Sequence, residues 1–184
     1  MRYNARVMDN GLTYACRSTS AEATKELAAG LAPFLAPDDV VVLKGDLGAG
    51  KTQFVQGVAR ALGVTDAVVS PTFNLVLEYR SGRLPLFHFD WYRLEEASEL
   101  EDIGYFDLIE GGGVSFIEWG ERFPQELPAG YLEVTLTADM DGTRAIAARA
   151  FGSRSRALLE QWVGDVGNGS DTCGSGAGVW SAEA

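Results

Sequence analysis

The sequence predicts an α/β fold, a three-layer sandwich in which a central, mainly parallel sheet lies between layers of helices. Two observations support this prediction. The run at 40–43 is VVVL, a β-branched stretch without polar alternation, as expected for a strand buried on both faces of a parallel sheet. It leads directly into a glycine-rich turn at 45–50 and then into a segment whose apolar residues recur at helical spacing. A strand, a turn and a helix in this order form the unit from which parallel sheets are built.

Helices are predicted on both sides of this turn. A first helix begins near Thr19, which has capping-box spacing with Glu22, and the prolines that follow it imply a frayed or kinked end. The second helix follows the glycine-rich turn and stops at Gly63. Two later stretches are compatible with helix, an acidic one at 94–109 and a short one at 156–163.

The remaining strands are predicted from short apolar or alternating runs between turn signals. They lie at 73–79, 84–89, 114–117, 131–137 and 143–150. The first two are close enough in sequence to form an antiparallel hairpin, and the Asp141-Gly142 turn predicts a hairpin between the last two.

Length and charge limit the classes of protein that fit. The 184 residues suit one domain, expected to span residues 1–163, and the Gly/Ser-rich segment 164–184 is predicted to be a disordered tail. The net charge of −11 would repel a phosphate backbone, so unaided binding of nucleic acid is disfavoured, although a partner protein could hold it. Cys16 and Cys173 fit neither a disulfide framework nor a metal cluster. Because no segment resembles a secretory signal or a membrane span, we expect a cytoplasmic protein without a membrane partner.

The segment at 45–52, GDLGAGKT, matches the full G-x-x-x-x-G-K-[ST] phosphate-binding loop, or P-loop. Its glycines let the backbone turn N–H groups inward around phosphate oxygens at the start of a helix. Lys51 would bring a positive charge to the β- and γ-phosphates, and the Thr52 hydroxyl would be a ligand for Mg²⁺. A carboxylate beside phosphates is unfavourable, so the side chain of Asp46 is expected to point into solvent. The motif predicts a P-loop NTPase-like fold in which the loop binds a nucleotide through Gly45, Asp46, Leu47, Gly48, Ala49, Gly50, Lys51 and Thr52.

A P-loop enzyme also needs a carboxylate near Mg²⁺, at the carboxyl end of a neighbouring strand. Two residues fit this position, Asp90 after the apolar run at 86–89 and Glu118 after the run at 114–117. Both would lie where an open parallel sheet presents its ligand crevice. The residue pattern leaves open which of the two carboxylates touches the metal.

Three further residues stand near these acids. Thr72 could sense a γ-phosphate, although its spacing alone favours an ordinary Ser-Pro turn. His88, the only histidine, shares a strand face with Asp90, but a lone histidine in an apolar strand is more often structural. Trp119 is first interpreted as a core or interface aromatic, although its position beside the candidate acids leaves a contact role at the site open. The chain has no N-K-x-D segment of the kind that recognises guanine, which favours ATP as the nucleotide.

Four motifs in this order resemble the TsaE family, also called YjeE: GDLGAGKT (45–52), SPTF (70–73), HFDWYRL (88–94) and IEWGE (117–121). The resemblance covers roughly residues 15–150. It implies a P-loop ATPase of bacterial tRNA threonylcarbamoyladenosine biosynthesis that hydrolyses ATP weakly alone and acts with TsaD and TsaB. Those partners, with TsaC, modify the adenosine next to the anticodon of tRNAs reading ANN codons. The chain would therefore meet tRNA only indirectly, through the complex.

The resemblance also implies roles for the residues of the two acidic motifs and the P-loop. Lys51 would bind phosphate and take part in catalysis. Thr52 and Glu118 would hold Mg²⁺. Asp90 would be needed for hydrolysis and would position the attacking water.

Other roles implied by the resemblance lie at the margins of the site. Thr72 would be a switch-like catalytic threonine, Trp119 would lie beside the nucleotide, and Ala21 would approach the adenine. The chain departs from the family pattern at two positions beside the site. Trp91 stands where an aliphatic residue is more usual, and Gly120 where proline is frequent.

Two other function classes stay open on the residues alone. A small-molecule or nucleotide kinase also uses a P-loop, but it would need an arginine-rich lid or acceptor pocket, and the arginines here are scattered. A nucleotide-binding scaffold would keep the loop and show no turnover. The preferred interpretation is a Mg²⁺-dependent ATPase subunit whose γ-phosphate shifts loops and so biases contacts with partner proteins.

Overall fold

The chain alternates between strands and helices over most of its length. A computed structural model describes residues 13–168 and 181–182. Its elements in chain order are β1 (Thr13–Ser18), α1 (Ala21–Ala29), η1 (Ala32–Phe34), β2 (Val40–Lys44), α2 (Lys51–Leu62), β3 (Val76–Tyr79), β4 (Leu86–Asp90), α3 (Glu99–Asp102), α4 (Tyr105–Ile109), β5 (Val114–Glu118), η2 (Gly120–Arg122), η3 (Pro124–Glu126), β6 (Tyr131–Ala138), β7 (Arg144–Phe151), α5 (Ser153–Asn168) and β8 (Ser181–Ala182).

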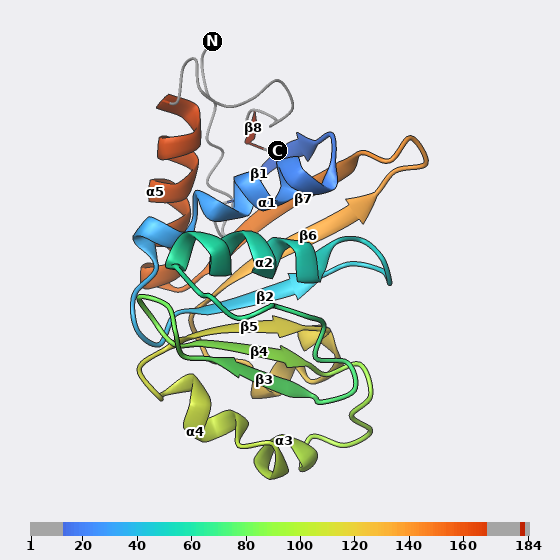
Figure 1. Cartoon of the computed structure of the whole chain (residues 1–184), viewed down its shortest axis with the longest axis vertical. Helices are drawn as coiled ribbons and strands as arrows, with labels where there is room; N and C mark the ends of the chain where they lie inside the picture. Colours follow the sequence, from blue (N-terminus) through green and yellow to red (C-terminus); the bar gives the residue numbers. More distant parts are fainter. Residues whose placement is uncertain (1–12, 169–180, 183–184) are drawn as a thin grey trace.

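The described strands form one sheet in the order β3-β4-β5-β2-β6-β7-β1-β8 (Figure 1). The four central strands, β4, β5, β2 and β6, are parallel, whereas β3, β7, β1 and β8 join antiparallel at the margins. This confirms the predicted mainly parallel centre and both predicted hairpins. Because β2, β4 and β5 run the same way, the residues that follow them meet at one edge of the sheet.

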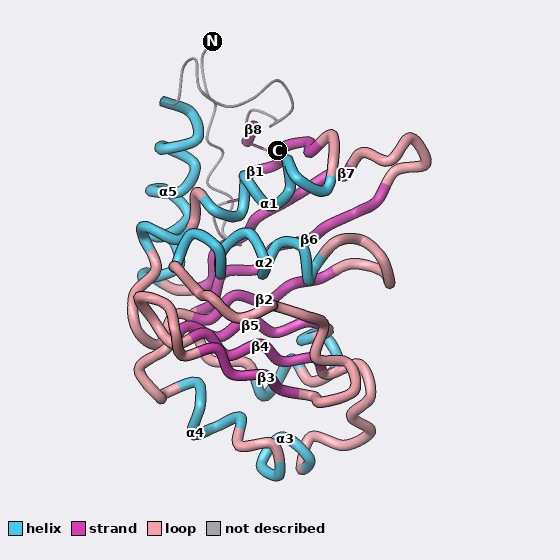
Figure 2. The backbone as a smooth tube through the Cα atoms, in the orientation of Figure 1, coloured by secondary structure: helices cyan, strands magenta, loops and turns pink. Residues whose placement is uncertain are grey.

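Apolar side chains cover both faces of this sheet, and the pleat of β2 explains how. Val41 and Leu43 point into a core that includes residues of α1, α2 and α5. Val40 and Val42 point into the opposite core, which includes Leu100 of α3 and Tyr105 of α4. Figure 2 shows α5 at one end of the molecule, and α3 and α4 at the other. The three-layer arrangement is therefore confirmed, with only short helices in the second helical layer.

Three local predictions differ from the structure. The N-cap of α1 is Ser20, whose side chain accepts a hydrogen bond from the backbone N–H of Ala23, so the cap lies one residue after Thr19. Strand β1 was not predicted, because its pairing partner β7 lies far away in the sequence. The acidic stretch at 94–109 is not one helix but the two short helices α3 and α4, separated by Gly104 at a φ of 70°.

The last helix of the domain extends past the predicted domain boundary at residue 163. Helix α5 starts at Ser153 and runs to Asn168, so the boundary at 163 falls inside a helix. Beyond it, residues 181–182 pair antiparallel with Tyr14 and Ala15 of β1, and the other residues predicted as tail lie outside the described part. Within the described residues, no helix combines the length and apolarity needed to cross a bilayer.

Candidate functional site

The P-loop lies between β2 and α2, and its shape requires glycine at both ends. Gly45 has a φ of 134°, and a Cβ there would lie 2.2 Å from the carbonyl oxygen of Leu136 on β6. Gly50 is the N-cap of α2 with a φ of 107°. These backbone conformations are rarely adopted by residues with a side chain, so the sequence fixes the sharp turn from strand to helix.

The start of α2 is arranged to receive an anion. No side chain caps this helix, and its first turn holds no acidic residue. The first helical hydrogen bond runs from the N–H of Phe54 to the carbonyl of Gly50, so the N–H groups of Lys51, Thr52 and Gln53 need partners from outside the helix. The helix dipole adds partial positive charge at the same place. A phosphate group would satisfy both requirements.

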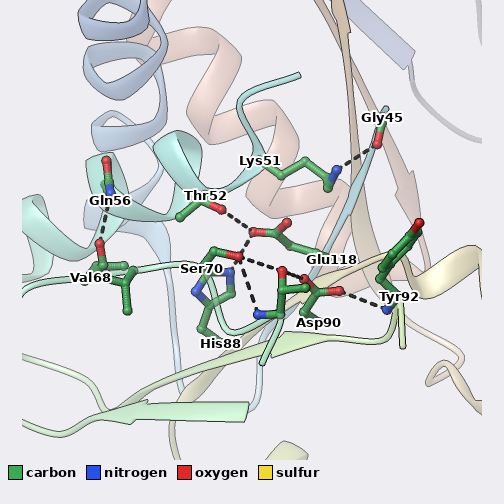
Figure 3. A network of polar contacts seen from close by, with 12 residues as sticks. Gly45, Lys51, Thr52, Gln56, Val68, Ser70, His88, Asp90, Tyr92 and Glu118 are labelled. Atoms are coloured by element: carbon green, nitrogen blue, oxygen red, sulfur yellow. Dashed lines mark hydrogen bonds and ion pairs between the residues drawn. The ribbon is translucent and has the colours of Figure 1, made fainter. Parts of the chain in front are cut away.

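Lys51 is almost fully buried beside the loop. Its Nζ donates to the carbonyl oxygens of Gly45 at 2.7 Å and Asp46 at 3.1 Å (Figure 3), and it lies 4.2 Å from the ring centroid of Trp119. Burial lowers the pKa of Lys51 below its usual value, and the nearby carboxylates, above all Glu118, oppose that change. Phosphate oxygens carry more charge than the two carbonyls and would compete with them for this ammonium group.

Two buried carboxylates face the lysine from the edge of the sheet. Asp90 and Glu118 are the last residues of β4 and β5 and stand directly opposite each other in the parallel register. The Thr52 hydroxyl donates to Oε1 of Glu118 at 2.9 Å, which joins the first turn of α2 to β5 (Figure 3). The same Oε1 lies 2.9 Å from Nε2 of His88.

Asp90 has a separate set of partners. Its Oδ1 accepts a hydrogen bond from the backbone N–H of Tyr92 at 2.9 Å, and its Oδ2 accepts one from the hydroxyl of Thr72. The hydroxyls of Ser70 and Thr72 lie 2.8 Å apart. Thus the loop before β3, which was first interpreted as an ordinary turn, touches the acid at the end of β4.

These groups line one cavity of about 260 Å³, formed by Leu47, Gly48, Gly50, Lys51, Thr52, Gln53, Ser70, Thr72, Asp90, Glu118 and Trp119. Sites for whole small molecules usually enclose about 300–1,000 Å³. The cavity therefore suits the phosphate tail of a nucleotide, with the nucleoside part extending beyond it.

Most of the predicted site residues lie in this cavity, and four do not. Gly45 and Asp46 reach it only through carbonyls bonded to Lys51, the side chain of Asp46 being exposed, and Ala49 is buried behind the loop. Ala21 opens α1 and does not line the cavity.

Sequence reasoning missed three residues of the site. Gln53 and Ser70 line the cavity, and His88 contacts Glu118. The strand face that His88 shares with Asp90 was visible in the sequence, but a lone histidine in an apolar strand favoured a structural role. For Ser70 the available signal was the repeated hydroxyl in the Ser-Pro-Thr turn.

The chemistry of these side chains fits Mg²⁺. Among residues 13–168 no three His, Cys, Asp or Glu side chains gather as a protein-only metal cage. Magnesium in phosphate sites instead uses one or two protein oxygens together with phosphate oxygens and water. The hydroxyl of Thr52 and the carboxylate of Glu118, in contact beside the P-loop, supply that donor set.

Comparisons with known proteins show which family the chain resembles. The family model described as "Threonylcarbamoyl adenosine biosynthesis protein TsaE" matches residues 18–146. The tRNA threonylcarbamoyladenosine biosynthesis protein TsaE of Bacillus subtilis is 42% identical over 145 residues, which cover 79% of this chain and 90% of that protein. Its namesake from Treponema pallidum is 44% identical over 131 residues, or 71% of this chain and 96% of that protein. The crystal structure of Bacillus subtilis YdiB gives a TM-score of 0.72 at 36% identity, covering 82% of this chain and 93% of that one.

Proposed function

The chain belongs to the TsaE family, and from this premise we propose that it is a Mg²⁺-dependent ATPase of tRNA threonylcarbamoyladenosine biosynthesis. The observation that carries the ATPase proposal is the contact between Thr52 and Glu118 beside the P-loop, with Asp90 opposite Glu118 on the next strand. In this proposal the groups that would bind phosphate, the groups that would hold the metal and a second acid all line one cavity.

Binding would begin with the triphosphate tail. The N–H groups at the start of α2 would donate to phosphate oxygens, and Lys51 would turn from the carbonyls of Gly45 and Asp46 to the β- and γ-phosphates. Thr52 and Glu118 would hold Mg²⁺. When bound, this ion supplies positive charge that neutralises the phosphate oxygens.

Hydrolysis would then depend on Asp90. Its carboxylate is buried, and a backbone N–H and the Thr72 hydroxyl fix its orientation. A carboxylate held in this way can accept a hydrogen bond from a water molecule and align it for attack on the γ-phosphate. The Thr72 hydroxyl donates to this same carboxylate, so loss of the γ-phosphate would also shift the loop that carries Thr72. That shift would change contacts with partner proteins.

The partners that we propose are TsaD and TsaB, with tRNA held by the complex. The net charge of −11 supports this division of labour, since an acidic chain repels the tRNA backbone at long range. Such a complex would work in the cytoplasm, where tRNA is modified.

Calorimetry and turnover measurements on the full chain test the proposal. We expect the non-hydrolysable ATP analogue to bind with Mg²⁺ in the wild type. Asp90→Asn should lower turnover by about 10²–10⁴-fold while binding stays within a few-fold, because general-base or water-positioning groups contribute on this scale. The matched control is Asp107→Asn, which makes the same change at an exposed position on α4.

The same measurements separate the alternatives. No heat with any adenine nucleotide would refute nucleotide binding itself. Turnover of Asp90→Asn equal to that of the wild type would favour a scaffold without catalysis. Consumption of ATP that rises with small-molecule acceptors, and does not respond to TsaD and TsaB, would favour a kinase.

A further inference from the structure

We propose that His88 is a positioning residue, which fixes the orientation of the Glu118 carboxylate and thereby sets the affinity of the site for Mg²⁺. The inference rests on the proposed function, because it concerns the metal of that same cavity. It assigns a role to the single histidine of the chain, a buried polar side chain that the binding of phosphate does not require.

The register of two parallel strands places His88 against the acid. On β4, His88 stands opposite Phe116 of β5, and Asp90 stands opposite Glu118. Side chains two residues apart on a strand share a face, so His88 and Asp90 lie on the same face of the sheet as Glu118. His88 is fully buried, and its Nε2 lies 2.9 Å from Oε1 of Glu118 (Figure 3).

Hydrogen bonding determines which nitrogen carries the proton. An ionised carboxylate only accepts hydrogen bonds, so Nε2 of His88 donates to Oε1 of Glu118. Nδ1 of His88 is buried and has no partner among the described residues, which disfavours a proton there. The hydroxyl of Thr52 donates to the same Oε1. Both hydrogen bonds described for this carboxylate therefore arrive at one oxygen, and Oε2 would be available to bind the metal or one of its waters.

A purely space-filling role explains this residue less well. A leucine or methionine would fill a buried position in β4 without leaving a ring nitrogen unsatisfied, and an unsatisfied buried acceptor destabilises the fold. What histidine adds here, compared with these apolar residues, is the Nε2–H bond to Glu118. Groups that orient metal-binding carboxylates in this way typically change metal affinity by about 10–100-fold.

Three substitutions separate positioning from packing. His88→Gln puts an amide N–H near the place of Nε2, His88→Leu removes every donor at similar volume, and His88→Asn keeps a polar amide that is too short to reach Glu118. The measurement is the Mg²⁺ concentration that half-saturates tight binding of a fluorescent, non-hydrolysable ATP analogue. The affinity for the same analogue in excess EDTA is measured in parallel, and circular dichroism confirms folding.

We expect the half-saturating Mg²⁺ concentration to rise about tenfold or more in His88→Leu and His88→Asn, and to stay within about threefold of the wild type in His88→Gln. The affinity for the ATP analogue in excess EDTA should be the same in the wild type and in the three variants. Should His88→Leu become unfolded, the comparison of His88→Asn with His88→Gln carries the test, since both are polar amides.

Several results would overturn the inference. One is a wild-type Mg²⁺ response in both His88→Asn and His88→Leu, and another is a His88→Gln protein as poor as His88→Asn. A third is a loss of affinity in EDTA as large as the loss with Mg²⁺, which would mark a structural role. Failure of the wild type to bind nucleotide would be a different outcome, because it would refute the proposed function and this inference together.

Discussion

Replacing Gly45 by alanine should destabilise the protein more than the same replacement at Gly48, although both glycines belong to the P-loop and both have positive φ. The difference lies in what surrounds them. A Cβ at Gly45 would lie 2.2 Å from the carbonyl oxygen of Leu136 and 3.1 Å from the Cβ of Ala49. A Cβ at Gly48 would meet no heavy atom within 4 Å. Gly48→Ala is therefore a matched control.

The magnitude follows from two separate costs. A residue with a Cβ loses about 1–2 kcal/mol when its backbone adopts a left-handed conformation, and this is the whole expected cost at Gly48. At Gly45 the close approach to β6 forces the loop or the strand to move, and overpacking of this kind costs about 1–3 kcal/mol more. We expect Gly45→Ala to lower the free energy of unfolding by about 2–5 kcal/mol in total.

Urea denaturation followed by circular dichroism measures both variants, with thermal melting as a second readout. For a chain of this length each kcal/mol shifts Tm by about 2–4 °C. Nucleotide titration adds a functional readout, because the carbonyl of Gly45 accepts a hydrogen bond from Lys51 and would move with the loop. Gly45→Ala should bind the ATP analogue more weakly than Gly48→Ala does. If Gly45→Ala is no less stable than Gly48→Ala, the close packing of the P-loop on β6 is refuted.

Three further predictions concern the site and the core. Thr72→Val removes a hydrogen bond to Asp90, so ATP turnover should fall at least about tenfold while the affinity for the ATP analogue stays unchanged. An equal loss of turnover and of analogue affinity would contradict this prediction. Because Lys51 lies over the Trp119 ring, Mg²⁺-nucleotide should change Trp119 emission, and Trp119→Phe should abolish the change. Burial raises the pKa of the Cys16 thiol to about 12. In a variant lacking the other cysteine, a disulfide reagent at pH 8 should modify Cys16 rapidly only after urea is added. As the pH rises, the Cys16 thiol loses its proton near pH 9.0 in the unfolded chain and near pH 12 in the folded one. The stability that the protonated thiol contributes to the fold should therefore be complete below pH 9.0 and be lost as the pH approaches 12.

The P-loop unit was predictable because its determinants are local. The β-branched run, the glycines and the helical spacing that follows lie within 40–63 and specify strand, turn and helix without help from the rest of the chain. The two strand-end acids were predictable for a related reason, since the carboxyl ends of parallel strands meet at one edge. The order of the strands in the sheet was not, because it depends on pairings across the chain.

Features that depend on distant contacts escaped prediction. Strand β1 begins with three half-buried residues and only its last three alternate between buried and exposed, and it is held by pairing with β7 more than a hundred residues later. The contact of His88 with Glu118 exists only in the register that pairs β4 with β5. A histidine whose partner is set by strand register cannot be distinguished in sequence from one that fills a core. The break between α3 and α4 turns on the single positive φ of Gly104, which helical periodicity does not reveal.

Asp90 and Glu118 hold equivalent positions, each as the last residue of a parallel strand, and their hydrogen-bond partners are what separates their proposed roles. Glu118 is bonded to Thr52, which belongs to the helix that would hold the phosphates, so this carboxylate is tied to the part of the site that stays with the nucleotide. Asp90 is bonded to Thr72, which lies in the loop between α2 and β3 and not in the helix that would hold the phosphates. A metal ligand must keep its place through the reaction, whereas a group that reports the loss of γ-phosphate must be coupled to a segment other than the helix that holds the phosphates. This difference is the physical reason for proposing that Glu118 would hold Mg²⁺ and that Asp90 would position the attacking water.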